Sequence, residues 1–209
     1  MRKLIISCII IMSFNLGLFS QNLAKSEMYY EEAMELLQST DIVSKATVEK
    51  AIGLYQKAIL SDPGFGSAYE QLATDYWSIG KNQKAYEVLA QAQKSAPADA
   101  ATFTLLLGMF KESEGNIPEA NKLYKQSIAL FDISVPKTKS LYLVFYRSLA
   151  YYLTENVDIA IEKYNEAVNK GYYQEDEYDE LYGMQLELLE TMDLMEYIDL
   201  SILNKYGLR

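Results

Sequence analysis

The sequence repeats a pattern of small, large and proline residues at a fixed interval, and this repeat limits the possible folds more than any other feature. One copy consists of Ala51, Tyr55, Ala58 and Pro63. The same frame returns 34 residues later, filled by Ala85, Leu89, Ala92 and Pro97. Small residues three or four positions from a large one share a helix face and let a second helix approach closely. Proline then ends the helix because it lacks an amide hydrogen. The repeat therefore predicts helix hairpins that stack on one another.

Two later stretches keep the pattern. They comprise Leu107, Gly108, Gly115, Ala120, Tyr124 and Ser127 in one copy and Ala160, Tyr164 and Ala167 in the other. The stretch from Tyr69 to Pro97, with Leu72, Ala73 and Tyr76 in its first helix and Gly80 at its turn, resembles a tetratricopeptide repeat (TPR). The resemblance covers residues 26 to about 172.

This resemblance implies an all-α fold, a right-handed superhelical solenoid of antiparallel helix hairpins with about four repeats and an acidic pair of capping helices. The expected segments are a signal peptide at 1–20, repeats at 26–63, 66–97, 101–134 and 141–172, and capping helices at 175–209. Composition and periodicity independently predict about ten helices. Their expected spans are 26–39, 46–60, 66–79, 82–95, 99–113, 116–131, 138–154, 156–170, 175–191 and 193–206. Pro136 predicts one kink, between residues 133 and 140.

The first twenty residues have the pattern of a secretory signal. Arg2 and Lys3 precede a long apolar run, and cleavage is expected after Ser20, so that the mature chain begins at Gln21. An uncleaved anchor and a lipoprotein site at Cys8 remain alternatives. The signal, together with a composition rich in Ile, Asn, Lys and Tyr, resembles exported proteins of Gram-negative bacteria. We therefore expect the protein in the periplasm or cell envelope.

Charge and residue inventory exclude several classes of function. The chain has 29 Asp and Glu against 19 Lys and Arg, a net charge of −10, which disfavours nucleic acid as a partner. It has no histidine and one cysteine, so catalytic triads and His-ligated or multi-cysteine metal sites are excluded. No cofactor or metal is predicted. Carboxylate pairs such as Glu31 and Glu35 share a helix face, but ordinary surface patterning places them there too. We therefore expect no enzyme, and carboxylate catalysis stays the alternative from another class.

In the TPR family the first helix of each hairpin lines a concave groove that binds peptides or partner proteins. The matching positions in this chain are Tyr30, Met34, Leu37, Glu70, Thr74, Trp77, Leu105, Met109, Glu112, Arg147 and Tyr151. Trp77, the single tryptophan, has two interpretations. It is either an aromatic anchor of the groove or a core residue that packs against the neighbouring hairpin.

Between Glu175 and Asp199 the chain has ten acidic residues and no basic one. The stretch is either a solvated cap or a docking surface for a basic partner. The main hypothesis is an exported, non-catalytic scaffold that binds a peptide or partner protein in the groove, without membrane insertion of the mature chain. The alternative is a structural subunit of an envelope assembly, held through its convex face or acidic cap.

Overall fold

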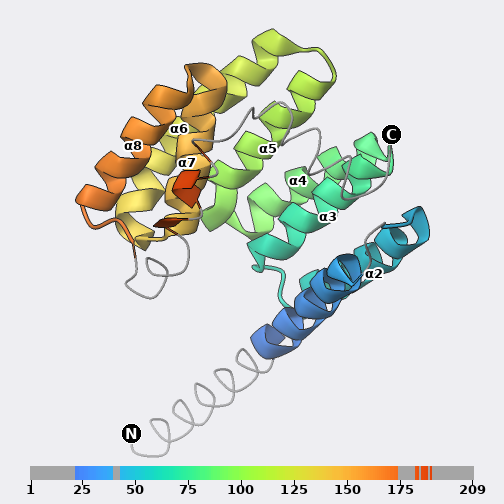
Figure 1. Ribbon diagram of the computed structural model, residues 1–209. Coiled ribbons are helices and arrows are strands. Elements are labelled where there is room, and N and C mark those ends of the chain that lie inside the picture. Colours follow the sequence, from blue (N-terminus) through green and yellow to red (C-terminus); the bar gives the residue numbers. More distant parts are fainter. Residues whose placement is uncertain (1–21, 40–42, 174–181, 184, 188, 190–209) are drawn as a thin grey trace, which may run out of the picture.

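The chain folds into antiparallel helix hairpins that stack in the order of the sequence (Figure 1). The computed structural model describes residues 22–39, 43–173, 182–183, 185–187 and 189. The helices are 22–38, α2 (Lys45–Ser61), α3 (Gly66–Ser78), α4 (Asn82–Ser95), α5 (Ala100–Ser113), α6 (Ile117–Thr138), α7 (Leu141–Thr154) and α8 (Val157–Asn169). A short 3₁₀ helix, η1 (Pro97–Asp99), leads into α5.

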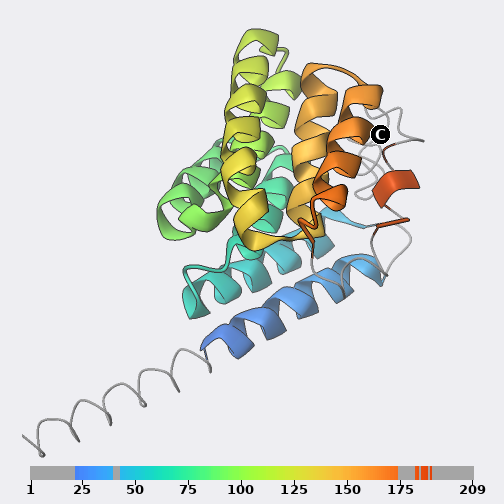
Figure 2. The ribbon, with the colours of Figure 1, turned by 90° about the vertical axis from the view of Figure 1, so that its left-hand side faces the viewer.

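Each hairpin pairs one of these helices with the next, beginning with helix 22–38 and α2. Figure 2 shows this first hairpin at one end of the stack and α7 with α8 at the other. The expected all-α array of sequential antiparallel helix pairs is thus confirmed. In the described part of the chain, no helix has the length and apolar character needed to cross a membrane.

Local signals in the sequence set the ends of several helices. Ser44, Asn116 and Asn156 cap the N-termini of α2, α6 and α8, each accepting a hydrogen bond from a backbone amide three residues on. Gly80 and Gly115 turn the chain between the helices of the second and third hairpins with φ of 76° and 79°. Few other residues adopt this left-handed backbone without strain, which explains glycine at both turns.

The repeated small and aromatic positions form the core. The side chains of Ala51, Tyr55, Ala58, Ala85, Leu89, Ala92, Ala120, Tyr124, Ala160, Tyr164 and Ala167 are all buried. Gly108 shows why small residues are needed, since a Cβ atom there would lie 2.5 Å from the ring of Tyr124. The two helices of the third hairpin therefore approach more closely than alanine would permit.

The third hairpin departs from the prediction at its end. Its second helix, α6, was expected to end at 131 but continues to Thr138, with Pro136 in the last turn. A proline removes one hydrogen bond, to the carbonyl four residues earlier, and this weakens the turn before it while the residues after it can stay helical. Lys139, with φ of 51°, then ends α6, and α7 begins at Leu141 rather than at 138. Residues 133–138 are thus part of a helix.

Beyond Tyr173 the described residues 182, 183, 185–187 and 189 are helical. Leu189 is buried against the last hairpins, and Gln185 accepts a 2.8 Å hydrogen bond from the hydroxyl of Tyr164. Of the ten acidic residues between 175 and 199, the structure describes only Glu187, which is exposed. The predicted signal peptide, the helix at 193–206 and the other nine acidic residues lie outside the described part.

Candidate functional site

The first helices of the four hairpins, which are helix 22–38, α3, α5 and α7, form what we call the first-helix face. One buried carboxylate of this face is Glu70 of α3, which is only 6% exposed. Buried carboxylates are rare in proteins unless hydrogen bonds or charges compensate for the lost water. The surroundings of Glu70 therefore define the candidate site.

Two tyrosines of α7 supply the compensating hydrogen bonds. The hydroxyl of Tyr142 lies 2.8 Å and 2.7 Å from the two carboxylate oxygens of Glu70, and the hydroxyl of Tyr146 donates to Oε1 at 2.7 Å. The two tyrosine rings are 4.5 Å apart between centroids. Because α5 lies between α3 and α7 in the stack (Figure 1), this contact links the second hairpin to the fourth. Direct side-chain contacts in a solenoid usually join neighbouring repeats only.

The electrostatics of the site reflect its burial. Burial raises the pKa of the Glu70 carboxyl, while the hydrogen bonds from Tyr142 and Tyr146 oppose this shift. Burial, reinforced by the negative charge of Glu70, raises the pKa of Tyr30 to about 12. The pKa of Tyr142 rises for the same two reasons. Tyr30 and Tyr142 therefore keep their protons near neutral pH and can act as hydrogen-bond donors.

A second carboxylate, Asp99, lies at the start of α5. Burial raises its pKa, and its negative charge adds to the upward shift of the pKa of Glu70. The carboxylate occupies the space beside Gly66, where a Cβ atom would lie 1.9 Å from Oδ2. The favourable field at a helix N-terminus helps to stabilise a carboxylate beside the first residue of α3.

The structure places Trp77 in the packing between hairpins. Its ring stacks on Phe110 of α5 with centroids 4.1 Å apart and an interplanar angle of 4°, and it meets Tyr86 edge to face at 5.8 Å. Lys111 lies over the outer side of the Tyr86 ring at 4.3 Å. Of the two interpretations of Trp77, the contacts correspond to packing against the neighbouring hairpin.

Several other predicted groove residues are also engaged within the fold. Leu37 and Leu105 are 2% and 0% exposed, so these two core residues offer no surface to a ligand. The sulfur of Met34 accepts a hydrogen bond from the Tyr55 hydroxyl at 3.2 Å, and Glu112 accepts one from Tyr124. Thr74 bonds the backbone oxygen of Glu70, and Met109 packs between the two halves of the core. Tyr30, Met34, Thr74, Met109 and Glu112 all remain partly exposed.

On α7 the residues that contact α3 are not the two that the TPR frame predicted as groove residues. Arg147 forms a 2.7 Å salt bridge with Asp132 of α6 and lies over the ring of Tyr151 at 5.4 Å. Tyr142 and Tyr146 contact Glu70 instead. The only sequence signal for these two tyrosines is their spacing of four, which puts both on one side of a helix.

Comparison with known proteins adds little beyond the geometry. No protein-family model matches the sequence, and no curated protein matches it. Among the solved structures that match is the crystal structure of MamA, with a TM-score of 0.41 and 19% identity over 73% of this chain and 84% of that chain. The fold assignment therefore rests on the hairpins themselves. The fold is TPR-like.

TPR-like arrays stack repeats into extended surfaces that bind other proteins. The chemistry of the first-helix face agrees with binding, because carboxylates and tyrosine hydroxyls can recognise amides and basic side chains. Within the described residues, no group of three or more His, Cys, Asp or Glu side chains is arranged to hold a metal ion.

Proposed function

We propose that this chain is an exported, non-catalytic scaffold that binds an extended segment of a partner protein along its first-helix face. The observation that carries the proposal is the meeting of Glu70, Tyr142 and Tyr146 there, in contacts that cross an entire hairpin. Tyr30 is close enough for the charge of Glu70 to shift its pKa. Groups from the first, second and fourth hairpins thus lie within reach of a single peptide.

Accessibility supports the same proposal. Tyr142 is 39% exposed even though its hydroxyl bonds a buried carboxylate, so one side of the ring faces solvent. A large aromatic ring held in place by a hydrogen bond contributes contact area at small cost in conformational entropy. We therefore propose Tyr142, rather than Trp77, as the aromatic anchor of the face, because the stack of Trp77 on Phe110 is part of the packing between hairpins.

Site-specific photo-crosslinking tests this binding mode in cells of the source organism. A benzoylphenylalanine residue replaces Tyr142 in one variant, Tyr151 in a second, and Ile133 in a control. Ile133 is 57% exposed on α6, a second helix of a hairpin. The proposal expects the same partner to be crosslinked from 142 and, more weakly, from 151, and not from 133. A partner crosslinked from 133 alone would favour the envelope-assembly hypothesis.

Export has its own test. Cell fractionation followed by N-terminal sequencing of the purified protein is expected to give a periplasmic or envelope-associated chain that begins at Gln21. A cytosolic chain that retains Met1 would contradict export and leave the binding surface unaffected.

A further inference from the structure

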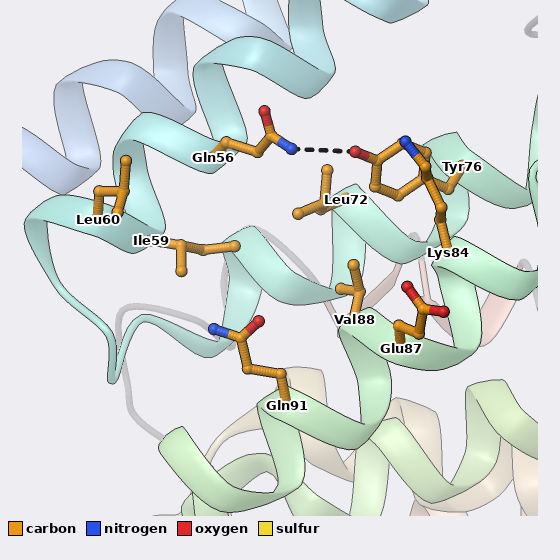
Figure 3. A pocket seen from close by; sticks show the side chains of 9 residues that line it. All are labelled: Gln56, Ile59, Leu60, Leu72, Tyr76, Lys84, Glu87, Val88 and Gln91. Atoms are coloured by element: carbon orange, nitrogen blue, oxygen red, sulfur yellow. Dashed lines mark hydrogen bonds between the residues drawn. The ribbon is translucent and has the colours of Figure 1, made fainter.

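The second helices of the first two hairpins, together with Leu72 and Tyr76 of α3, line an open hollow. It lies between α2 and α4, with a volume of about 480 Å³. Figure 3 shows Ile59, Leu72 and Val88 forming its apolar floor, with Gln56, Gln91 and Lys84 around them. No residue of the hollow belongs to the predicted groove.

The hollow combines apolar surface with hydrogen-bonding groups. Leu60, on its rim, is 82% exposed, the highest exposure among the large hydrophobic residues that the structure describes. Gln56 donates a 3.0 Å hydrogen bond to the Tyr76 hydroxyl at the edge of the hollow (Figure 3). A large apolar side chain beside a hollow with a polar rim is typical of a binding surface rather than of an ordinary solvated face.

The charges around this surface are opposite in sign to those of the chain as a whole. α2 and α4 carry five lysines and two glutamates, in a chain with a net charge of −10. The lysines are Lys45, Lys50, Lys57, Lys84 and Lys94. In the described part of the chain none of the five forms a salt bridge.

Neither glutamate forms a salt bridge with one of these five lysines within the described residues, and one of the two, Glu87, lines the hollow together with Lys84. Glu49 is paired with Lys81, which lies outside both helices, at 2.9 Å. Glu87 accepts a hydrogen bond from Gln83 at 3.1 Å. Lys84 lines the hollow, and Lys94 lies three residues after Gln91, which places it one turn further along the same side of α4. Both lysines can therefore meet a carboxylate brought by another molecule.

We propose that the surface formed by α2 and α4 around Leu60 is a second docking site, which takes an acidic amphipathic helix of a partner protein. A large apolar side chain of that helix fills the hollow over Ile59, Leu72 and Val88. Its flanking carboxylates pair with Lys84 and Lys94. Charge complementarity selects this partner, because basic or neutral helices would leave the two lysines unpaired. The site is separate from the first-helix face and does not depend on the function proposed for that face.

A designed peptide provides the test. The probe is a fluorescein-labelled amphipathic helix of roughly 18 residues, with leucines on one face and glutamates on the other. The control peptide has lysine in place of every glutamate. Fluorescence anisotropy with the purified full chain is expected to show binding of the glutamate peptide only. The affinity is expected to fall at least about tenfold when salt is raised from roughly 50 mM to 500 mM.

Variants locate the site. Leu60→Gln and the pair Lys84→Glu with Lys94→Glu are each expected to weaken binding by about tenfold or more. The matched controls lie on α6, where Ile133→Gln removes an exposed apolar side chain and Lys125→Glu reverses an exposed charge, and both are expected to bind as the native chain does. Circular dichroism checks that every variant is folded.

Several results would overturn the proposal. They are the absence of glutamate-peptide binding to the native chain, equal binding of the lysine peptide, or equal losses in the α6 controls. Sedimentation that shows a dimer abolished by Leu60→Gln and not disrupted by the peptide would assign the surface to a second copy instead. Crosslinking from position 142 tests the first-helix face separately, so a negative result in the peptide experiments would not affect the function proposed for that face.

Discussion

The two faces of this array treat their charged groups in opposite ways. On the first-helix face the carboxylate of Glu70 is enclosed and receives hydrogen bonds from Tyr142 and Tyr146. On α2 and α4 the five lysines are exposed and form no salt bridge within the described residues. The cause is position in the stack, because first helices lie between neighbours whereas second helices form the outer surface. In α5, residues 101–106 are all buried. Polar groups inside the stack are thus held by hydrogen bonds within the fold, whereas the lysines outside it remain exposed.

The largest effect is expected from removing the aromatic stack. Trp77→Ala deletes a side chain that packs on Phe110 and Tyr86 and should lower the free energy of unfolding by about 3 kcal/mol. Urea denaturation followed by circular dichroism measures the change. Leu60→Ala, which shortens an exposed side chain on the other face, is the matched control and should change stability by less than about 0.5 kcal/mol. Equal losses would mean that Trp77 is not a core residue.

A glycine-to-alanine substitution, which adds one methyl group, is expected to change stability in opposite directions on the two faces. Gly108→Ala places a Cβ atom against the buried ring of Tyr124 and should cost about 2 kcal/mol through overpacking. At Gly53 of α2 the space is open, and Gly53→Ala should stabilise the protein by about 0.5 kcal/mol through helix propensity. Thermal unfolding of both variants gives the comparison. A stable Gly108→Ala protein would show that α5 and α6 can move apart.

Removal of the two tyrosine hydroxyls tests the enclosed carboxylate. The double variant Tyr142→Phe with Tyr146→Phe keeps the rings and leaves Glu70 buried without these donors. We expect a loss of about 1.5 kcal/mol at neutral pH, because an unsatisfied buried charge is costly. Tyr151→Phe, a change of the same size on α7 that keeps the ring beneath Arg147, is the control. In a Glu70→Leu background the same double tyrosine substitution should lower the free energy of unfolding much less, since no carboxylate remains that needs these hydrogen bonds.

The pH dependence of stability follows from the same carboxylate. Burial raises the folded-state pKa of Glu70 above its ordinary value of 4.5, so the folded state holds this proton more tightly than the unfolded state. The stabilising contribution of protonation is complete below pH 4.5 and is lost as the pH rises through the folded-state pKa. The native chain should therefore lose stability relative to Glu70→Gln as the pH rises above 4.5. A difference that is constant with pH would mean that Glu70 titrates normally.

The smallest effect is expected on the outer face. Lys84→Glu with Lys94→Glu should change the free energy of unfolding by less than about 0.5 kcal/mol, because both lysines are exposed and neither forms a salt bridge within the described residues. In the last hairpin the lysines are used differently. Hydrogen bonds from Lys170 and Lys163 lower the pKa of Glu166 to about 2. Lys163→Glu should therefore destabilise the protein more than the α4 pair, as measured by urea denaturation at neutral pH.

The repeat in the sequence was enough to predict the hairpins. The frame residues Tyr55, Leu89, Tyr124 and Tyr164 recur because each must fill the same space between two helices, and all are buried. Helix ends were predicted well wherever glycine or a capping Asn or Ser marks them. Pro136 was misleading because a proline weakens the turn that precedes it and does not prevent the residues after it from continuing the helix.

The site could be predicted only in part. Glu70 was correctly placed on a first helix, but its partners are 72 and 76 residues away, and local periodicity contains no information about such a contact. Trp77 had two interpretations because sequence does not show that Phe110 lies flat against it. The sequence also could not show that the lysines of α2 and α4 lack salt bridges in the described part of the chain, since ion pairing depends on which helices become neighbours.

The bond between Glu70 and α7 has a consequence for how the array unfolds. Repeat arrays usually open stepwise from their ends, because each repeat contacts only the next. A contact that skips one hairpin ties the second, third and fourth hairpins into a single cooperative unit, with α5 enclosed at its centre. The amide hydrogens of α5 should then exchange with solvent only when this whole unit opens, while those of helix 22–38 exchange through fraying of the first hairpin alone.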